Sequence, residues 1–503
     1  MKTGITALIA LFLFGSCTNK SYDPQSMRPN ILFIITDDQS WEHLGCYGDE
    51  AVRTPNVDRL AASGIRYENA YTACPSCSPS RAGILTGQDV YRLEEGGVLT
   101  GILWDKFALF PEILAENGYM VGATGKRYWP RTRNVEGAVE EPIGGVYDKV
   151  KHPEVPFGIS KNDYSANFKQ FLEENSDEKP FFFWVGTGEP HRKYEIDRGV
   201  KTGIDTSKIR LPDFFPDIPV AKLDVADYMA EIEWADKVVG EMIDILESEN
   251  LLKETLVIYT SDNGMPHPRA KATLYDHGVR MPLIMHWPEM VETNRVVNDP
   301  ISLIDMAPTF LDLAGIDIPD QMTGQSIKDI ILSKRSGTVK ASKEFVVSAL
   351  EKHCDCRIDH LGYPRRAIHT EEWTFIINYE PDRFPMGGPD IFIPTWDILG
   401  DTDPGRLKEY YKANMDKPEF RHFYDLAFGK IPGEQLFNKI DDPDMVNNLA
   451  SSPEFQDIKD NLRVMLEKYL VDTDDPRQLG ESPWDNYRYD KPEGVLKPKS
   501  LLW

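Results

Sequence analysis

Short apolar segments recur along the chain and alternate with segments that have helical periodicity. Five of them cover residues 31–35, 119–124, 180–185, 256–260 and 282–286. Continuous apolar runs are typical of strands buried on both faces of a parallel sheet, so we predict five such strands. Residues 226–246 space their apolar side chains as a helix does and lead into the fourth run. This alternation predicts an α/β sheet with helices on both faces.

The same pattern divides the chain into three parts. Residues 28–350 hold the predicted sheet and form the main domain. Residues 351–503 begin with polar sequence, then show strand patterns at 373–379 and 434–437 and a helical pattern at 455–469. We therefore predict a smaller C-terminal α+β subdomain, followed by a tail.

Residues 1–17 read as a targeting signal. A positively charged start precedes an apolar run at 5–14, which is too short to span a bilayer as a mature helix. Small residues directly before Cys17 resemble a bacterial lipoprotein signal, in which Cys17 becomes the lipidated first residue. We expect a lipid-anchored protein of the periplasm or cell surface, on either membrane face. A plain secretory peptide cut nearby is the alternative.

Composition narrows the class of ligand. The chain has 503 residues, 41% of them hydrophobic, so it can bury a sizeable core. Its formal net charge of −25 argues against a protein that binds nucleic acid or an anionic membrane surface. Basic residues nevertheless gather on a few segments and predict a local positive cleft for an anionic ligand: Lys126, Arg127, Arg131, Arg133, Arg192, Lys193, Arg269, Lys271 and Arg280.

Four of the apolar runs end in polar residues suited to binding metals or anions. The first ends in Asp37 and Asp38, the second in Lys126, the third leads to His191, and the fourth ends in Asp262 and Asn263. Open α/β sheets bind ligands at the carboxyl ends of their strands, so we expect one site built from distant segments.

The oxygen-bearing residues among these predict a hard cation. Asp37, Asp38, Asp262 and Asn263 offer three carboxylates and one amide, which suit calcium, or with less preference magnesium. No His/Cys spacing indicates zinc. Taken alone, the Asp-Asp pair could cap a helix and the Asp-Asn-Gly could form a turn.

Residues 77–87, Cys-Ser-Pro-Ser-Arg-Ala-Gly-Ile-Leu-Thr-Gly, predict a nucleophile at a helix start. Ser78 can cap a helix, Pro79 fits its first turn and Gly87 fits its end. Cys77 would then lie at a positive helix terminus, with Arg81 one turn further along the same face. A packed cysteine before a helix is the alternative for an arbitrary match.

This segment resembles a family signature. Cys-x-Pro-Ser-Arg followed by Leu-Thr-Gly is similar to the signature of the type I, formylglycine-dependent sulfatases, and the resemblance covers nearly the whole chain after the signal. Residues 76–82, 190–192 and 261–266 are most similar to the heparan N-sulfatase branch. The resemblance implies an alkaline-phosphatase-like mixed sheet sandwiched by helices, with a small C-terminal subdomain.

The resemblance also implies a mechanism. A separate maturation enzyme would convert Cys77 to formylglycine, whose hydrated aldehyde attacks sulfur with one hydroxyl and expels sulfate with the other. By position, Asp37, Asp38, Asp262 and Asn263 match the calcium ligands, with the modified Cys77 also touching the ion. The resemblance also implies that Arg81 holds the formylglycine and that His191 protonates the leaving group. Lys126 and Lys271 would bind the sulfate oxygens. We place Tyr128 and Arg192 beside the substrate.

Tyr128 departs from the family pattern. The family usually has a histidine two residues after the lysine, and that histidine is thought to help expel sulfate. Tyrosine is a weak base at neutral pH, so another group would have to take that step, or turnover would be slow, or the pocket has changed.

We therefore expect a calcium-dependent sulfatase of bacterial glycan degradation, acting on a sulfated polysaccharide such as ulvan or a glycosaminoglycan, or on its oligosaccharides. We rank a sulfate ester above an N-sulfate, because fold and motif do not fix the substrate. The alternatives are a phosphohydrolase or phosphonate hydrolase of the same superfamily, and a non-catalytic glycan-binding lipoprotein.

Overall fold

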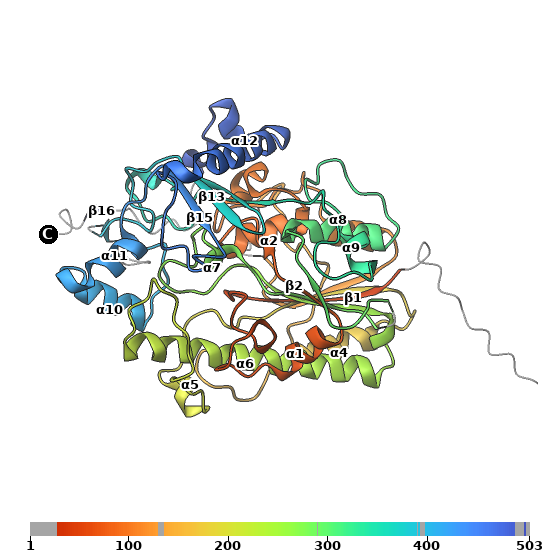
Figure 1. Ribbon diagram of the computed structural model, residues 1–503. Coiled ribbons are helices and arrows are strands. Elements are labelled where there is room, and N and C mark those ends of the chain that lie inside the picture. The colour runs from red at the N-terminus through yellow and green to blue at the C-terminus, as the bar shows by residue number, and fades with distance from the viewer. Residues whose placement is uncertain are drawn as a thin grey trace, which may run out of the picture.

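A mixed eight-stranded sheet lies at the centre of the larger part of the protein, between two layers of helices (Figure 1). The computed structural model describes residues 28–128, 135–288, 290–389, 391–392, 398–487 and 497–498. The strand order is β5-β4-β6-β1-β7-β8-β2-β9. The strands are β1 (Asn30–Thr36), β2 (Ile65–Tyr67), β4 (Met120–Gly125), β5 (Gly145–Val146), β6 (Phe181–Gly186), β7 (Thr255–Ser261), β8 (Leu283–His286) and β9 (Arg295–Val297).

The predicted strands are all present, but one runs in the opposite direction to that expected. β1, β4, β6 and β7 are parallel to their partners in this group. β8, predicted as a parallel strand at 282–286, is antiparallel to both β7 and β2. All four residues of β8 are buried, so the segment is apolar whichever way it runs, and the apolar pattern carries no information about its direction.

Helices cover both faces of this sheet, as predicted (Figure 1). Leu32 and Ile34 of β1 pack into the core shared with α1, α4 and α6, whereas Ile31, Phe33 and Ile35 face the core shared with α2, α3 and α8. The helices of this part are α1 (Pro55–Ala62), α2 (Cys77–Thr86), α3 (Phe110–Glu116), α4 (Tyr164–Glu174), α5 (Arg198–Lys201), α6 (Pro219–Ser248), α7 (Asp276–Val279), α8 (Met306–Leu313) and α9 (Lys328–Leu332).

A second, antiparallel sheet forms the core of the C-terminal part and takes its first strand from the last five residues of the predicted main domain. It comprises β11 (Val346–Leu350), β12 (Arg365–His369), β13 (Trp373–Asn378) and β15 (Glu434–Asn438). Its helices are α10 (Arg406–Asn414), α11 (Arg421–Phe428) and α12 (Gln456–Asp472). The predicted α+β character of the C-terminal part is confirmed.

Two further small sheets pair β3 (Ala70–Tyr71) with β10 (Ile301–Ser302), and β14 (Ile391–Phe392) with β16 (Lys497–Pro498).

The C-terminal sheet is bonded to the segment that leads into α2. The Ala349 N–H donates to the carbonyl of Ala73 at 2.8 Å. The Ser348 hydroxyl donates to the carbonyl of Thr72 at 2.7 Å. Because Cys77 follows a few residues later, the C-terminal part helps to fix the start of α2.

A buried imidazolium also joins the two parts. His277 of α7 places Nε2 2.9 Å from Asp444 Oδ1, and Nδ1 3.1 Å from Glu42 Oε1. Burial alone would lower the pKa of His277, but the two carboxylates raise it to about 9. His277 is therefore charged at neutral pH and stabilises the folded state.

We expect this contribution to disappear in mild alkali. A raised folded-state pKa stabilises fully below the ordinary value of 6.5 and loses its effect as the pH rises through about 9. The difference in unfolding free energy between the wild type and His277→Gln should shrink by about 3 kcal/mol across that interval, measured by urea unfolding. His286→Gln is the control, since the pKa of His286 is lowered and its difference should stay nearly constant. A constant difference for His277→Gln would contradict the assignment.

Candidate active site

The carboxyl ends of four parallel strands meet at one edge of the large sheet. Ile35 of β1 pairs with Gly186 of β6, which also pairs with Gly125 of β4. Thr36 at the end of β1 pairs with Ser261 at the end of β7. A Cβ on Gly186 would come within 1.6 Å of the Lys126 carbonyl, so only glycine allows this approach. The four strand ends therefore bring the residues that follow them to one edge of the sheet, as predicted.

Cys77 is the first residue of α2. Ser76, not the predicted Ser78, precedes the helix, and Ser78 lies inside its first turn with a buried hydroxyl that has no partner. The N-cap position is thus two residues earlier than expected, because Ser76 is the last extended residue and helical geometry begins at Cys77. Gly87 ends the helix in the left-handed conformation, as predicted. Burial raises the pKa of the Cys77 thiol, although Lys126 and Lys271 oppose this.

Arg81 lies one turn into α2 and is fully buried. Its Nε donates to Asp262 Oδ2 at 2.7 Å, and this carboxylate is also fully buried. Its Nη1 donates to the Lys126 carbonyl at 2.6 Å. Arg81 therefore ties α2 to the ends of β7 and β4, which places Cys77 against both segments.

Three carboxylates lie together beside Cys77. Asp37, Asp38 and Asp262 each offer an oxygen within 4.8 Å of the others, and all three are buried. The Asp38 N–H donates to Asp262 Oδ1 at 3.1 Å. Burial raises the pKa of Asp262, with the other two carboxylates adding to this and Arg81 opposing it. Lys126 holds the pKa of Asp37 well below its usual range despite burial.

Asn263 completes an oxygen-rich donor set. Its Nδ2 donates to Asp38 Oδ1 at 2.8 Å and to the Gly264 carbonyl at 3.0 Å. Its Oδ1 is buried and has no hydrogen-bond partner, an arrangement that costs free energy unless a cation or donor is bound. Three carboxylate groups with an orphaned amide oxygen fit a hard divalent cation.

Two lysines and a histidine face the carboxylates. Lys126 Nζ lies 2.6 Å from Asp37 Oδ2, and Lys271 Nζ lies 2.8 Å from Asp38 Oδ2. Burial would lower both lysine pKa values, but the carboxylates raise them, so both ammonium groups stay charged. His191 Nε2 lies 3.7 Å from Asp38 Oδ2. The structure thus brings together all the predicted catalytic and metal-binding residues.

Tyr128 and Arg192, predicted to contact substrate, have established partners. The Tyr128 hydroxyl donates to the Gly101 carbonyl at 2.7 Å, and burial raises its pKa. Arg192 is paired in a bidentate manner with Asp224, with its Nη2 2.6 Å from Oδ2. Their contact with substrate stays a prediction. Several other basic residues of the predicted cleft are likewise engaged: Arg127 with Glu141 and Asp148, Arg269 with two carbonyls, and Arg280 with Glu68. Arg131 and Arg133 lie outside the described residues.

Two site residues come from the C-terminal part and were missed by sequence reasoning. Asp403 Oδ2 lies 2.8 Å from Lys271 Nζ, and its carboxylate is within 4.8 Å of Asp38 and of the His191 ring. His353 Nδ1 lies 2.8 Å from the hydroxyl of Ser76, and burial lowers the pKa of its imidazole to about 4. Neither belongs to a spaced motif, and Asp403 sits in a sequence typical of a turn.

Comparisons with known proteins agree with this geometry. Residues 29–316 match the family described as Sulfatase, and residues 269–386 match N-sulphoglucosamine sulphohydrolase, C-terminal. Human N-sulphoglucosamine sulphohydrolase is 28% identical over 94% of this chain and 94% of its own. An ulvan-active sulfatase of Formosa agariphila is 26% identical over 90% of this chain and 77% of its own.

A solved structure in complex with its substrate, D-glucosamine-2-N,6-O-disulfate, matches with a TM-score of 0.64 at 18% identity. It covers 91% of this chain and all of that one. This likeness shows the predicted alkaline-phosphatase-like fold of the sulfatases. Since the family match spans more than half of the chain, the protein belongs to the sulfatase family and is a sulfuric ester hydrolase.

Proposed function

We propose that this protein is a calcium-dependent, formylglycine-bearing sulfatase that removes sulfate from a sulfated sugar. The observation that carries the proposal is Cys77 at the start of α2, between two charged lysines and an oxygen-only donor set. Cys77 would be converted to formylglycine by a separate maturation enzyme, and the modified side chain supplies a hydroxyl nucleophile where the thiol now lies.

Asp37, Asp38, Asp262 and Asn263 would hold the calcium ion. Calcium, when bound, supplies a positive charge that polarises a sulfate oxygen and the nucleophile. The orphaned Oδ1 of Asn263 gains a partner in this arrangement. Arg81 would keep the nucleophile in place, because its guanidinium is locked between Asp262 and the Lys126 carbonyl.

The protein's own cations and imidazole divide the remaining work. Lys126 and Lys271 would each place an ammonium against the sulfate oxygens and hold the sulfur in line with the nucleophile. His191 would donate a proton to the leaving atom, with its Nδ1 fixed 2.5 Å from the Arg192 carbonyl. Tyr128 is assigned no proton transfer, since its hydroxyl is bonded to Gly101 and its pKa is raised.

Asp403 supports an N-sulfated amino sugar as the first substrate. Its carboxylate lies near the His191 ring, where the leaving atom would accept a proton. Lys271 offsets part of the Asp403 charge through their 2.8 Å ion pair. The carboxylate can still accept a hydrogen bond from the protonated amine that leaves from a sulfamate, whereas the alkoxide that leaves from an ester has no proton to donate. We therefore propose the N-sulfate ahead of the sulfate ester, although the sequence alone favours the ester. The relationship to the human sulphohydrolase agrees with that order.

The proposal is tested by sulfate release. Purified protein matured in a competent host should release sulfate from N-sulfoglucosamine, and more slowly from sulfate esters of ulvan or glycosaminoglycan oligosaccharides. Ion chromatography of free sulfate measures both. Release from esters alone would be consistent with sulfatase activity but would overturn the assignment of an N-sulfated substrate.

Asp403→Asn should separate the two substrate classes. The variant keeps the side-chain shape but removes a charge-assisted contact worth roughly 1.5–3 kcal/mol, so kcat/KM for the sulfamate should fall about 10- to 100-fold. The value for an ester should change less. Asp416→Asn, exposed elsewhere in the C-terminal part, is the matched control. An equal loss on both substrates would mean that Asp403 acts only by holding Lys271.

The alternative of a phosphohydrolase with paired metals is disfavoured by Lys271. Asp38, His191 and Asp403 could form a second metal cluster, but the Lys271 ammonium already lies 2.8 Å from both carboxylates. Raised in pKa, it remains a fixed cation at that position. A non-catalytic glycan-binding role leaves the complete set around Cys77 without a purpose.

The cellular setting is also proposed. A lipid on Cys17 would anchor the enzyme in the periplasm or at the cell surface of a bacterium that degrades external glycan. Residues 1–27 lie outside the described residues. Among the described residues, no helix has the length and apolar character to cross a membrane.

A further inference from the structure

The imidazole of His191 is fixed by the backbone of the residue that follows it. Its Nδ1 lies 2.5 Å from the Arg192 carbonyl. A carbonyl oxygen can only accept a hydrogen bond, so Nδ1 carries a hydrogen and the proton that His191 can transfer is held on Nε2. Nε2 is the ring nitrogen that lies 3.7 Å from Asp38 Oδ2. The position of the Arg192 carbonyl therefore decides where the proton donor points.

Three hydrogen bonds fix the Arg192 side chain in turn. Nη1 and Nη2 donate to the two oxygens of Asp224 at 3.1 and 2.6 Å. Nε donates to the Pro266 carbonyl at 3.0 Å. The guanidinium also packs on the Tyr194 ring, 4.7 Å from its centroid. Arg192 is thus held between α6, which carries Asp224, and the segment that follows the proposed cation ligand Asn263.

Asp224 also holds the segment that carries Asp403. The Leu407 N–H, four residues after Asp403, donates to Asp224 Oδ2 at 3.3 Å. A Cβ on Gly405 would collide with the Arg192 guanidinium, so this segment runs directly against the same side chain. One carboxylate therefore sets the spacing between the two groups that face the leaving atom in the proposed mechanism, His191 and Asp403.

Asp224 is buried and stays charged. It is 2% exposed. Burial alone would raise its pKa, but Arg192 and then His267 lower it to about 2. A buried ion pair often adds little net stability compared with apolar residues of the same volume. The pair of Asp224 with Arg192 is therefore better explained by what it holds in place than by a gain in folding free energy.

We propose that Asp224 is a positioning residue of the reaction, which keeps His191 Nε2 and the Asp403 carboxylate at a fixed spacing around the leaving atom. When the bond from sulfur to the sugar nitrogen or oxygen breaks, its electron pair stays on that atom and the Nε2 proton of His191 moves to it. Asp224 acts through Arg192 and Leu407, and does not itself exchange the proton. The inference rests on the proposed function, which supplies His191 as the proton donor.

Two leaving groups separate this role from a purely structural one. A sugar amine or alkoxide needs the proton, whereas 4-nitrophenolate leaves without one. In the matured, calcium-loaded enzyme, Asp224→Asn should lower kcat about 100-fold for the sulfated sugar that the wild type hydrolyses fastest. KM for that sugar, and kcat for 4-nitrophenyl sulfate, should each change by less than about threefold. Initial rates of sulfate release measure both reactions.

Further variants allow for a loss of folding and for a poor aryl substrate. Asp224→Asn leaves the Arg192 charge buried without its partner, which is destabilising. Combining it with Arg192→Met removes both charges, and should give the same dependence on the leaving group with a smaller loss of unfolding temperature. Combining it with His191→Ala should leave turnover of the sugar no slower than in His191→Ala alone, because no donor remains to be positioned. This last comparison needs only the sugar.

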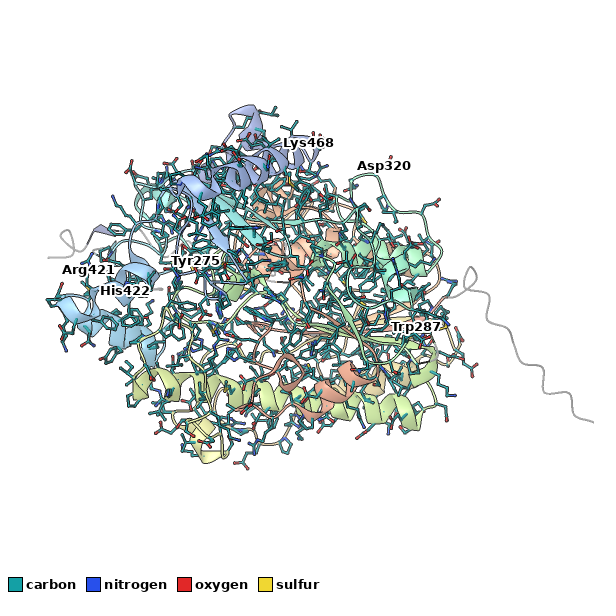
Figure 2. The ribbon with its side chains drawn as sticks, viewed as in Figure 1. Tyr275, Trp287, Asp320, Arg421, His422 and Lys468 are labelled. Carbon is teal, nitrogen blue, oxygen red and sulfur yellow. The ribbon has the colours of Figure 1, made fainter. Side chains whose placement is uncertain are left out.

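Asp236→Asn is the matched control. Asp236 is another buried carboxylate of α6, but it accepts hydrogen bonds from the N–H groups of Asn56 and Val57. Lys468→Gln is the surface control, on α12 at the opposite side of the molecule from α6 (Figure 2). Neither substitution should make the loss of kcat depend on the leaving group.

An equal loss on the two substrates in the Asp224 variants would overturn the positioning role and leave the proposed function intact. The same follows if Asp224→Asn slows turnover further in the His191→Ala background, or if Asp236→Asn shows the same dependence on the leaving group. A matured wild-type enzyme that releases sulfate from neither class of substrate would overturn the proposed function, and the positioning role with it.

Discussion

Cys77→Ala should reduce sulfatase activity by about four orders of magnitude or more, because removal of a covalent nucleophile leaves only binding and electrostatic contributions. The fold should survive. Cys77 is 7% exposed and makes no ion pair, so the substitution removes one buried sulfur, at a cost of about 1 kcal/mol in unfolding free energy. Sulfate release and urea unfolding measure the two effects on the same preparation.

Cys74→Ala is the matched control for that result. Cys74 is fully buried in the segment that leads into α2, and burial raises the pKa of its thiol. It should show the same small loss of stability while keeping its activity. Activity retained in Cys77→Ala, or an equal loss in Cys74→Ala, would remove the basis for assigning the nucleophile.

Removal of the divalent cation should have the second largest effect. Chelation should lower kcat by about three orders of magnitude, since a metal ion contributes several kcal/mol to stabilising a developing charge. It should also lower the unfolding temperature. An ion bound only to the folded state, at a concentration 100 times its Kd, adds about 2.7 kcal/mol. Differential scanning calorimetry with and without added calcium provides a measurement independent of turnover.

Asn263→Ala tests the same cation site by removing one of its proposed ligands. The substitution removes the buried, unpartnered Oδ1, so calcium should stabilise this variant less than the wild type. Calcium restoring activity and stability to the chelated wild type supports the site. A chelated protein with unchanged activity and unfolding temperature would exclude a structural or catalytic cation at Asp37, Asp38 and Asp262.

The local sequence predicts those strands and helices whose buried side chains form a recognisable apolar pattern. β1 is buried along its whole length, and its apolar run reveals it directly. The direction of β8 could not be read, because a strand buried on both faces looks the same in either direction. β2, β5 and β9 are two or three residues long and carry too little pattern to be recognised.

The site divides along similar lines. Cys77 and Arg81 lie on one helix, and Asp37 and Asp38 end one strand, so short-range spacing and the strand-end rule together find them. Asp403 and His353 reach the site only because the C-terminal part packs against the segment before α2. No local pattern records such a contact. The displaced start of α2 is a smaller case, since Ser76 and Ser78 are equally suited to capping by residue type.

The most direct measurement is a mass spectrum of the tryptic peptide 67–81 from protein matured in a competent host. This peptide contains both Cys74 and Cys77, so Cys74 serves as an internal standard. After alkylation of the denatured protein, we expect one alkylated cysteine and an aldehyde at residue 77. Two alkylated cysteines, in a host that matures other sulfatases, would contradict the formylglycine mechanism.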